Sequence, residues 1–242
     1  MIAIKIEGLT KKYKDVVAVD KLSFEVKKGE LFSLLGVNGA GKTTTIKMLT
    51  CLASPSEGDA YLLGKSIVSE SAEVKKFIAV SPQETAVARG LSVKENLELV
   101  CGVHGFKKEE RGKKIADLAQ KLGLSSVINK KAGKLSGGWQ RRLSIAMALI
   151  SEPKILFLDE PTLGLDVIAR SELWEIIASL KGEVTVILTT HYMEEAEALS
   201  DKIAIMKDGK LLVCDTAQGI KALAGRDSFE QAFISIVKGE VK

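Results

Sequence analysis

The chain has 242 residues, of which 46% are hydrophobic and 27% charged, a globular composition that suits one large core or a core with a subdomain. The 35 basic and 31 acidic residues leave a net charge of only +4, and so small an excess argues against nucleic acid as a partner. The 3 cysteines are far apart and have no metal-ligand spacing. No export signal opens the chain, and no apolar run approaches the ~20 residues of a membrane helix. These observations predict a soluble cytoplasmic protein with reduced thiols.

The N-terminal part of the chain predicts strands on either side of a glycine-rich turn. Residues 3–9 and 22–26 alternate apolar and polar side chains, whereas residues 31–35 form an almost wholly apolar run. Such a run is typical of a strand that is buried on both faces. The turn leads from it into a helix over about residues 42–52, and a further strand is expected at 58–63.

The middle of the chain, from about residue 84 to residue 151, changes to a helical pattern. Ser92 and Glu95 form a capping box, which is a sequence signal for the start of a helix. Apolar residues then recur with helical spacing, first before Gly123 and again after Ser136. We predict an inserted helical subdomain here.

The C-terminal part returns to strands that alternate with helices. Strands are predicted at 155–158 and 184–189, each followed by a helix, and an Asp-Gly pair at 208–209 is a strong hairpin signal. From about residue 216 the tail has an amphipathic helical pattern. This alternation indicates an α/β fold with a mainly parallel sheet flanked by helices. Because no linker rich in Pro, Gly or Ser interrupts it, we expect a single domain over residues 1–242.

A phosphate-binding loop is predicted between the apolar strand and the first helix. The pattern G-x-x-x-x-G-K-[ST], in the strand–loop–helix context that it requires, is matched by Gly36-Val37-Asn38-Gly39-Ala40-Gly41-Lys42-Thr43. The glycines allow backbone N–H groups to converge on phosphate oxygens, and the positive end of the helix adds to the same spot. We expect Lys42 to reach the outer phosphates and the Thr43 hydroxyl to ligate Mg²⁺, so that the loop predicts ATP and Mg²⁺ binding.

Two carboxylates follow the apolar run at residues 155–158. Asp159, at the end of the predicted strand, suits direct or indirect binding of Mg²⁺. Glu160 is expected to point to the other side and to polarise a water for in-line attack on the γ-phosphate. The alternative is an acidic pair at the start of a helix near Pro161, but the phosphate loop elsewhere in the chain favours the catalytic interpretation.

His191 follows the strand predicted at 184–189. The carboxyl ends of strands are where open α/β sheets bind ligands. A lone histidine is more often structural, but this position favours a side chain that contacts the γ-phosphate or orients the attacking water.

A second anion site is predicted at the start of a helix in the middle of the chain. Leu135-Ser136-Gly137-Gly138 provides an N-cap at Ser136 together with free backbone donors. A capped helix start is common, so this signal is weak by itself. One ATP does not need two such sites from the same chain, unless two chains face each other head to tail.

Taken in their order along the chain, these motifs resemble the nucleotide-binding subunit of an ABC transporter over almost the whole length. Gly164-Leu165-Asp166 resembles the D-loop of that family, and His191 matches its switch histidine. Gln83 is similar to the Q-loop glutamine, which senses Mg²⁺ and the transmembrane partner. Tyr13 stands where the family stacks an aromatic ring on adenine.

The resemblance implies a P-loop NTPase core with an N-terminal antiparallel β subdomain and the inserted helical subdomain. Two chains, in a homodimer or heterodimer, would sandwich two ATP molecules, each held by one chain's phosphate loop and the other chain's signature. Hydrolysis would drive a separate membrane permease, which would place the protein on the inner face of the cell membrane. The expected site has a catalytic set (Gln83, Glu160, His191), a metal set (Thr43, Gln83, Asp159) and a nucleotide set (Tyr13, Gly36, Asn38, Gly39, Ala40, Gly41, Lys42, Thr43, Thr44, Ser136, Gly137, Gly138, Asp166).

Two features bear on the type of transporter. The family usually carries Gln where this chain has Trp139, and some exporters carry Met, so local packing or permease contact differs there. Residues 189–197 and 228–233 are similar to the drug- and antibiotic-export type, which favours an exporter. An importer energy subunit and a non-transport nucleotide-gated switch are the alternatives. The transported substrate is read by the permease and not by this chain.

Overall fold

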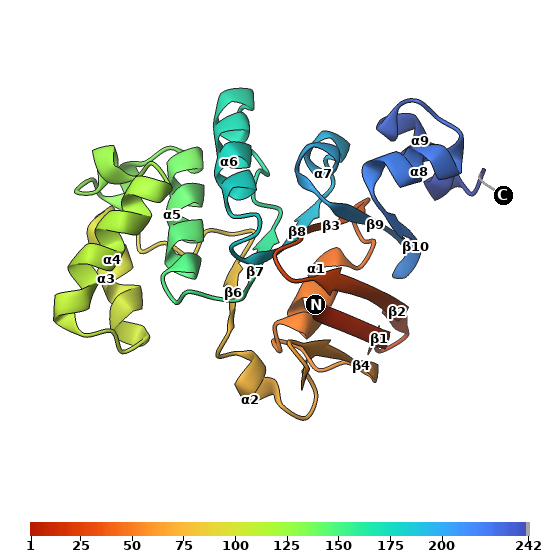
Figure 1. Ribbon diagram of the computed structural model, residues 1–242, viewed down its shortest axis with the longest axis horizontal. Coiled ribbons are helices and arrows are strands. Elements are labelled where there is room, and N and C mark those ends of the chain that lie inside the picture. The colour runs from red at the N-terminus through yellow and green to blue at the C-terminus, as the bar shows by residue number, and fades with distance from the viewer. Residues whose placement is uncertain (241–242) are drawn as a thin grey trace.

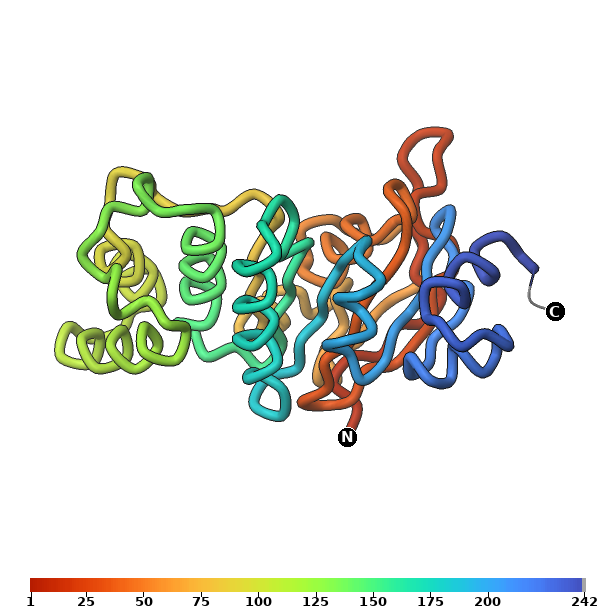
Figure 2. The backbone as a smooth tube through the Cα atoms, turned by 90° about the horizontal axis from the view of Figure 1, so that it is seen from above, coloured from red at the N-terminus to blue at the C-terminus, as the bar shows by residue number. Residues whose placement is uncertain are grey.

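The computed structural model describes residues 1–240. Within them, a central sheet of six strands lies between a group of helices from the middle of the chain and the C-terminal helices. Figures 1 and 2 show these two helical groups at opposite ends of the long axis of the molecule. A second, antiparallel sheet packs beside the central one, and this arrangement is the predicted α/β fold.

The central sheet contains β3 (Leu31–Gly36), β6 (Ile78–Ser81), β7 (Ile155–Asp159), β8 (Thr185–Thr190), β9 (Lys202–Lys207) and β10 (Lys210–Asp215). Their order is β10-β9-β3-β8-β7-β6, and every neighbouring pair is parallel except β9 with β10. β9 and β10 form the hairpin predicted at 208–209. The edge strand β6 was not predicted, because it is short and only partly buried and therefore lacks a clear hydrophobic pattern.

The antiparallel sheet contains β1 (Ile2–Tyr13), β2 (Val16–Lys27), β4 (Glu57–Leu62) and β5 (Lys65–Ser66) in the order β2-β1-β4-β5, and the short helix α2 (Ser71–Val74) follows it. β1 and β2 are longer than predicted, since they continue to a hairpin tip where Tyr13 pairs with Val16. The tip is exposed on both faces, so no alternation of apolar residues marks it in the sequence.

The central sheet is buried on both faces because successive side chains of a strand point in opposite directions. Phe32 and Leu34 of β3 point toward the antiparallel sheet and share a core with α1 (Lys42–Leu49). Leu31 points to the other face and shares a core with α6 (Val167–Ser179). Full burial of such side chains contributes roughly 1.5–3 kcal/mol each to folding. The loops at the ends of these strands are thereby held on a rigid support.

The helices from the middle of the chain form a separate core. The predicted capping box is confirmed, since the Ser92 hydroxyl accepts from the Glu95 N–H at 3.2 Å and the Ser92 N–H donates to the Glu95 carboxylate at 2.7 Å. Leu97, Leu122 and Leu143 are fully buried in this core. The three helices are α3 (Val93–Val103), α4 (Lys108–Lys121) and α5 (Gly137–Leu149).

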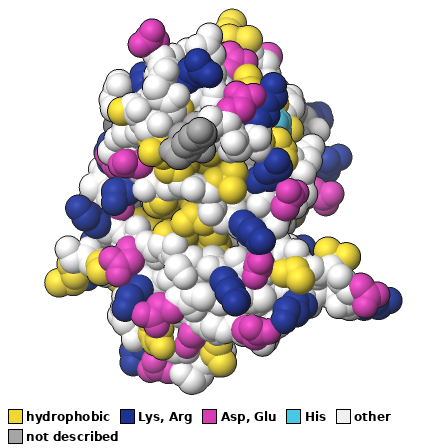
Figure 3. All heavy atoms as spheres, turned by 90° about the vertical axis from the view of Figure 1, so that its right-hand side faces the viewer, with side chains coloured by type: hydrophobic (Ala, Val, Ile, Leu, Met, Phe, Trp, Pro, Cys, Tyr) yellow, Lys and Arg dark blue, Asp and Glu magenta, His cyan; other side chains and the backbone are white. Residues whose placement is uncertain are grey.

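The C-terminal tail is helical as predicted, but it forms two helices that follow α7 (Met193–Leu199) and β10. They are α8 (Ala217–Ala224) and α9 (Phe229–Lys238), and Gly225, with a φ of 60°, ends the first of them. Residues 241–242 of the predicted tail lie outside the described residues. Hydrophobic side chains gather in a hollow at this end of the molecule (Figure 3). None of the helices described is long and apolar enough to span a bilayer.

Candidate functional site

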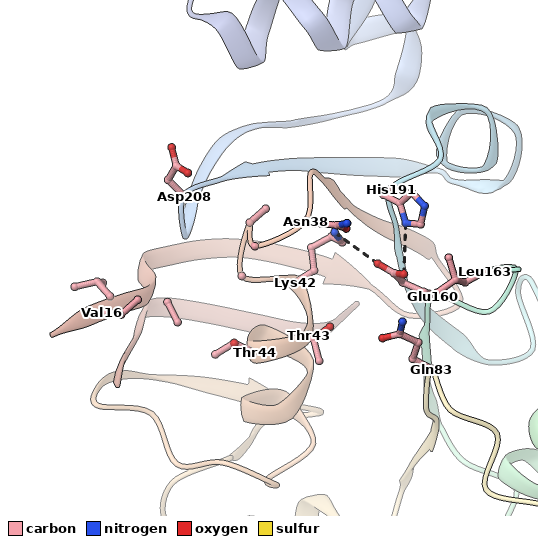
Figure 4. Close-up of a pocket in the computed structure, with 15 residues that line it drawn as sticks. Val16, Asn38, Lys42, Thr43, Thr44, Gln83, Glu160, Leu163, His191 and Asp208 are labelled. Atoms are coloured by element: carbon pink, nitrogen blue, oxygen red, sulfur yellow. Dashed lines mark ion pairs between the residues drawn. The ribbon is translucent and has the colours of Figure 1, made fainter. Parts of the chain in front are cut away.

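The carboxyl ends of β3, β8 and β7, which are neighbours in the sheet, open into a pocket of about 690 Å³. Figure 4 shows Lys42, Glu160, His191 and Gln83 converging on it from four different segments. The pocket lining comprises Val16, Val17, Ala18, Asn38, Gly39, Ala40, Gly41, Lys42, Thr43, Thr44, Gln83, Glu160, Leu163, His191 and Asp208. The site therefore lies at the sheet edge where α/β proteins bind their ligands.

The phosphate loop connects β3 to α1 in a conformation that requires glycine. Gly39 and Gly41 have φ of 81° and 98°, which side chains with a Cβ rarely adopt. A Cβ at Gly36 would lie 2.4 Å from the Met206 carbonyl oxygen, and one at Gly41 would lie 2.5 Å from that of Ala18. Gly41 is also the N-cap of α1 and brings no side chain to the helix start. The first backbone N–H groups of α1 are thus left to an anion.

Lys42 is the buried cation of this loop. Its side chain is only 5% exposed, and its ammonium donates to the carbonyl oxygens of Gly36 and Val37 at 2.8 and 3.2 Å. Burial lowers the pKa of Lys42, and the nearby Glu160 and Asp159 oppose that change. The ammonium lies 3.8 Å from the Glu160 carboxylate, so the pocket already holds a cation beside a carboxylate.

Thr43 lines the pocket, and Asp159 lies beside it at the end of β7. The Thr43 hydroxyl donates to the Asp159 carboxylate at 3.4 Å, and the Thr189 hydroxyl donates to the same oxygen. Residues 1–240 contain no cluster of three or more His, Cys, Asp or Glu side chains able to hold a metal. Mg²⁺ does not need one, because it binds through one or two carboxylates together with hydroxyl, phosphate and water oxygens. The Thr43 and Asp159 oxygens, together with Gln83, which lines the same pocket as Thr43, fit that donor set.

Glu160 is held in a backbone conformation that is rare for glutamate. Its φ is 47°, and its N–H donates to the carbonyl and the hydroxyl of Thr189 at 3.1 and 3.0 Å. The side chain is 12% exposed, with one carboxylate oxygen 3.4 Å from His191 Nδ1. That nitrogen is buried and makes no hydrogen bond in this structure. Rare backbone conformations of this kind cluster at functional sites.

The predicted signature residues lie away from the pocket. Ser136 is the N-cap of α5, as predicted, but its side chain makes no capping hydrogen bond. Gly138 is buried against α6, where a Cβ would lie 3.0 Å from that of Ala169. Asp166 caps α6 by accepting from the Ala169 N–H at 2.9 Å. None of Ser136, Gly137, Gly138 and Asp166 is among the residues that line the pocket.

The tip of the β1–β2 hairpin reaches the pocket through residues other than Tyr13. Tyr13 is 46% exposed and is not a lining residue, and the Lys11 ammonium lies 5.0 Å from the centre of its ring. Val16, Val17 and Ala18 line the pocket instead. The one sequence signal for them is the Val16-Val17 pair, which follows Tyr13 after two residues and belongs to no alternating pattern. Leu163 and Asp208 were likewise not predicted, since loop residues reach the pocket only through the fold.

A family model described as ABC transporter matches residues 19–163. The chain belongs to the ABC transporter family. It is 39% identical to the probable multidrug ABC transporter ATP-binding protein YbhF of Escherichia coli over 97% of its own length and 41% of YbhF. It is also 39% identical to the doxorubicin resistance ATP-binding protein DrrA of Mycobacterium tuberculosis, over 99% of its own length and 72% of DrrA.

Solved ABC structures share the fold. An ATP-binding subunit of an ABC transporter superposes with a TM-score of 0.84 at 25% identity, over 97% of this chain and 99% of that one. The ATP-binding cassette MJ0796, in a dimeric post-hydrolysis state bound to ADP and Pi, superposes with a TM-score of 0.78 at 28% identity, over 88% and 98%. The chain is accordingly an ABC ATPase domain.

Proposed function

We propose that this ABC ATPase domain hydrolyses ATP between two chains and thereby powers export through a separate membrane permease. The observation that carries the proposal is the convergence of Lys42, Glu160 and His191 at one sheet edge, beside a glycine loop with free backbone donors. This arrangement suits a triphosphate whose terminal phosphate lies between the ammonium and the carboxylate.

Glu160 is assigned the role of general base. It accepts a proton from water as the water oxygen bonds to the γ-phosphorus and the bond from that phosphorus to the bridging oxygen breaks. His191, 3.4 Å from the Glu160 carboxylate, orients the water or the γ-phosphate. Thr43, Asp159 and Gln83 would hold Mg²⁺, which neutralises charge on the phosphates when bound. Lys42 stabilises the outer phosphates.

A second chain is proposed because the phosphate loop and the start of α5 do not line the same pocket within one chain. The backbone donors at Ser136 to Gly138 lie outside the pocket, so they serve a nucleotide only if another chain presents its phosphate loop to them. Export is supported by the relatives whose names carry multidrug and doxorubicin resistance. A permease partner would place this domain on the inner face of the cell membrane.

The test is Glu160→Gln. The amide keeps the size of the side chain but cannot accept the proton, so ATPase activity should fall about 10²–10⁴-fold while ATP still binds. The variant should accumulate as an ATP-bound dimer, measured by light scattering after size exclusion, whereas Lys42→Ala should not. Turnover close to that of the wild type would show that Glu160 is not the base.

A further inference from the structure

Glu195 is a buried carboxyl group to which the reaction above assigns no role. It lies on α7 and has no exposed surface. Its Oε1 accepts a hydrogen bond from the indole N–H of Trp174 on α6 at 3.1 Å. Its Oε2 is buried without a hydrogen-bond partner, and so is the hydroxyl oxygen of Thr162. A buried carboxyl group is costly unless its polar atoms are satisfied.

The neighbours of Glu195 come from the two loops that carry Glu160 and His191. The Thr162 and Thr190 hydroxyls are near enough to its carboxyl group to oppose the effect of burial on its pKa, and neither makes a hydrogen bond to it. Thr162 stands two residues after Glu160, and Thr190 directly precedes His191. Glu195 is therefore close to the segments that carry both reactive side chains. Its hydrogen bond to Trp174 connects it to α6.

A second set of contacts continues from Trp174 to His191. The Arg170 guanidinium lies 5.6 Å from the ring centres of both Trp174 and Tyr192. The Tyr192 ring lies 4.1 Å from the His191 ring, and the Tyr192 N–H donates to the Thr190 hydroxyl at 2.9 Å. The orientation of His191 thus depends on how α7 is seated against α6.

The surroundings favour the neutral acid. Burial raises the pKa of Glu195, and the Thr190 and Thr162 hydroxyls, the Trp174 indole and the Arg170 charge oppose this less strongly. The Arg170 guanidinium also lies 3.7 Å from the carboxylate of the exposed Glu194, so its charge is shared between the two carboxyl groups. A neutral carboxyl group carries one O–H donor. Such a donor suits a site in which Oε2 and the Thr162 hydroxyl are both buried without a partner.

We propose that Glu195 is a positioning residue which fastens the Glu160 and His191 loops to α6 through Trp174. The inference rests on the proposed function, because good positioning is measured through ATP hydrolysis. It assigns Glu195 no contact with ATP. Its loss should therefore lower kcat without changing the affinity for the nucleotide.

The kinetic test compares Glu195→Ala with Glu195→Gln, and uses Glu197→Ala as the matched control. Glu197 is on the same helix but is exposed and pairs with Lys221. Glutamine keeps a neutral acceptor and donor, so kcat should stay within about threefold, whereas alanine should lower kcat about 10–100-fold with KM changed less than threefold. A Gln variant as impaired as the Ala variant, or an Ala variant with unchanged kcat, overturns the proposal.

A second measurement does not need turnover, and it still applies if Glu195→Ala fails to fold. Indole emission is recorded against pH in Trp139→Phe and in Trp139→Phe/Glu195→Gln, so that Trp174 is the reporter. We expect the two curves to coincide at about pH 7 and to separate only at higher pH. Curves that differ at about pH 7 and converge in the ordinary acidic range of glutamate would show an ionised Glu195 and overturn the proposal. A wild type without ATPase activity would instead count against the proposed function.

Discussion

At the scale of single residues, the site is organised around the carboxylate of Glu160. It lies between the Lys42 ammonium at 3.8 Å and His191 Nδ1 at 3.4 Å. The positive φ of Glu160 costs of order 1–3 kcal/mol and persists only where the surroundings enforce it. Two hydrogen bonds from its N–H to Thr189 do so here. The direction of this carboxylate is therefore set by β8 as well as by its own strand.

His191→Ala should remove the group that faces the Glu160 carboxylate and orients the reacting atoms. We expect kcat to fall about 10²-fold or more, while ATP affinity measured by titration calorimetry changes less than threefold. His104→Ala is the control, because His104 is exposed at the end of α3 and should keep wild-type activity. If His191→Ala keeps wild-type activity as His104→Ala does, His191 has no part in the mechanism.

At the scale of elements, α5 is anchored to the segment that carries Gln83. The Arg141 guanidinium donates to the carbonyl oxygens of Pro82 and Gln83 at 2.7 and 2.6 Å. Its side chain is nearly buried, and burial lowers the pKa of Arg141. The helix that begins at Ser136 is thus tied to the segment that carries Gln83.

Arg141→Lys should break this anchor, because an ammonium cannot reproduce the planar fork that contacts both carbonyl groups. We expect the free energy of unfolding in urea to fall by about 1–3 kcal/mol. Arg226→Lys is the control, because Arg226 is exposed and its guanidinium donates one hydrogen bond to the Ser235 hydroxyl at 3.2 Å, so that the loss should stay within about 0.5 kcal/mol. Equal losses in both variants would show that the anchor does not stabilise the fold.

Trp139, the departure from the family pattern, packs against the core of the helical group, with the Arg142 guanidinium 4.8 Å from its ring centre. We expect this packing to be the role of Trp139, so that Trp139→Gln should change the ATP affinity of the isolated protein less than threefold, or below about 0.7 kcal/mol. The larger effect should appear in thermal stability or in permease-stimulated turnover. Tenfold weaker ATP binding would place Trp139 in the nucleotide site.

At the scale of the whole molecule, the two helix starts that we propose to bind phosphate belong to different parts of the fold. One begins α1 beside the central sheet, and the other begins α5 in the helical group (Figure 1). In the proposed function, a single chain would therefore present two half-sites. Two chains placed head to tail would form two complete ones.

Mixing Lys42→Ala with Ser136→Arg tests this arrangement. Each variant alone spoils both sites of its own dimer and should be inactive, whereas a mixed dimer keeps one intact site. We expect the mixture to regain a measurable part of wild-type ATPase activity. Specific activity of the wild type should also fall on dilution. Activity that stays proportional to protein concentration at high dilution, with no recovery in the mixture, would mean that one chain suffices.

Much of the fold could be predicted because its signals are local. The buried strands β3 and β7 are continuous apolar runs, and the capping box at Ser92 marks the start of α3. The short strand β6 and the exposed hairpin tip were missed, since partly buried or exposed residues leave no periodic pattern. The Gly225 break in the tail was missed as well, because one glycine in an amphipathic pattern does not by itself end a helix.

The sequence by itself determined the chemistry of the phosphate loop and the order of the motifs, because glycine spacing and strand-end carboxylates act through local backbone geometry. Only the tertiary structure decided which distant residues share the pocket. Val17 lines it whereas Tyr13 does not, and Asp208 reaches it from the β9–β10 hairpin. The burial of Glu195 beneath two loops likewise follows from the packing of α7 on α6. Such contacts join segments far apart in the chain, and no local pattern encodes them.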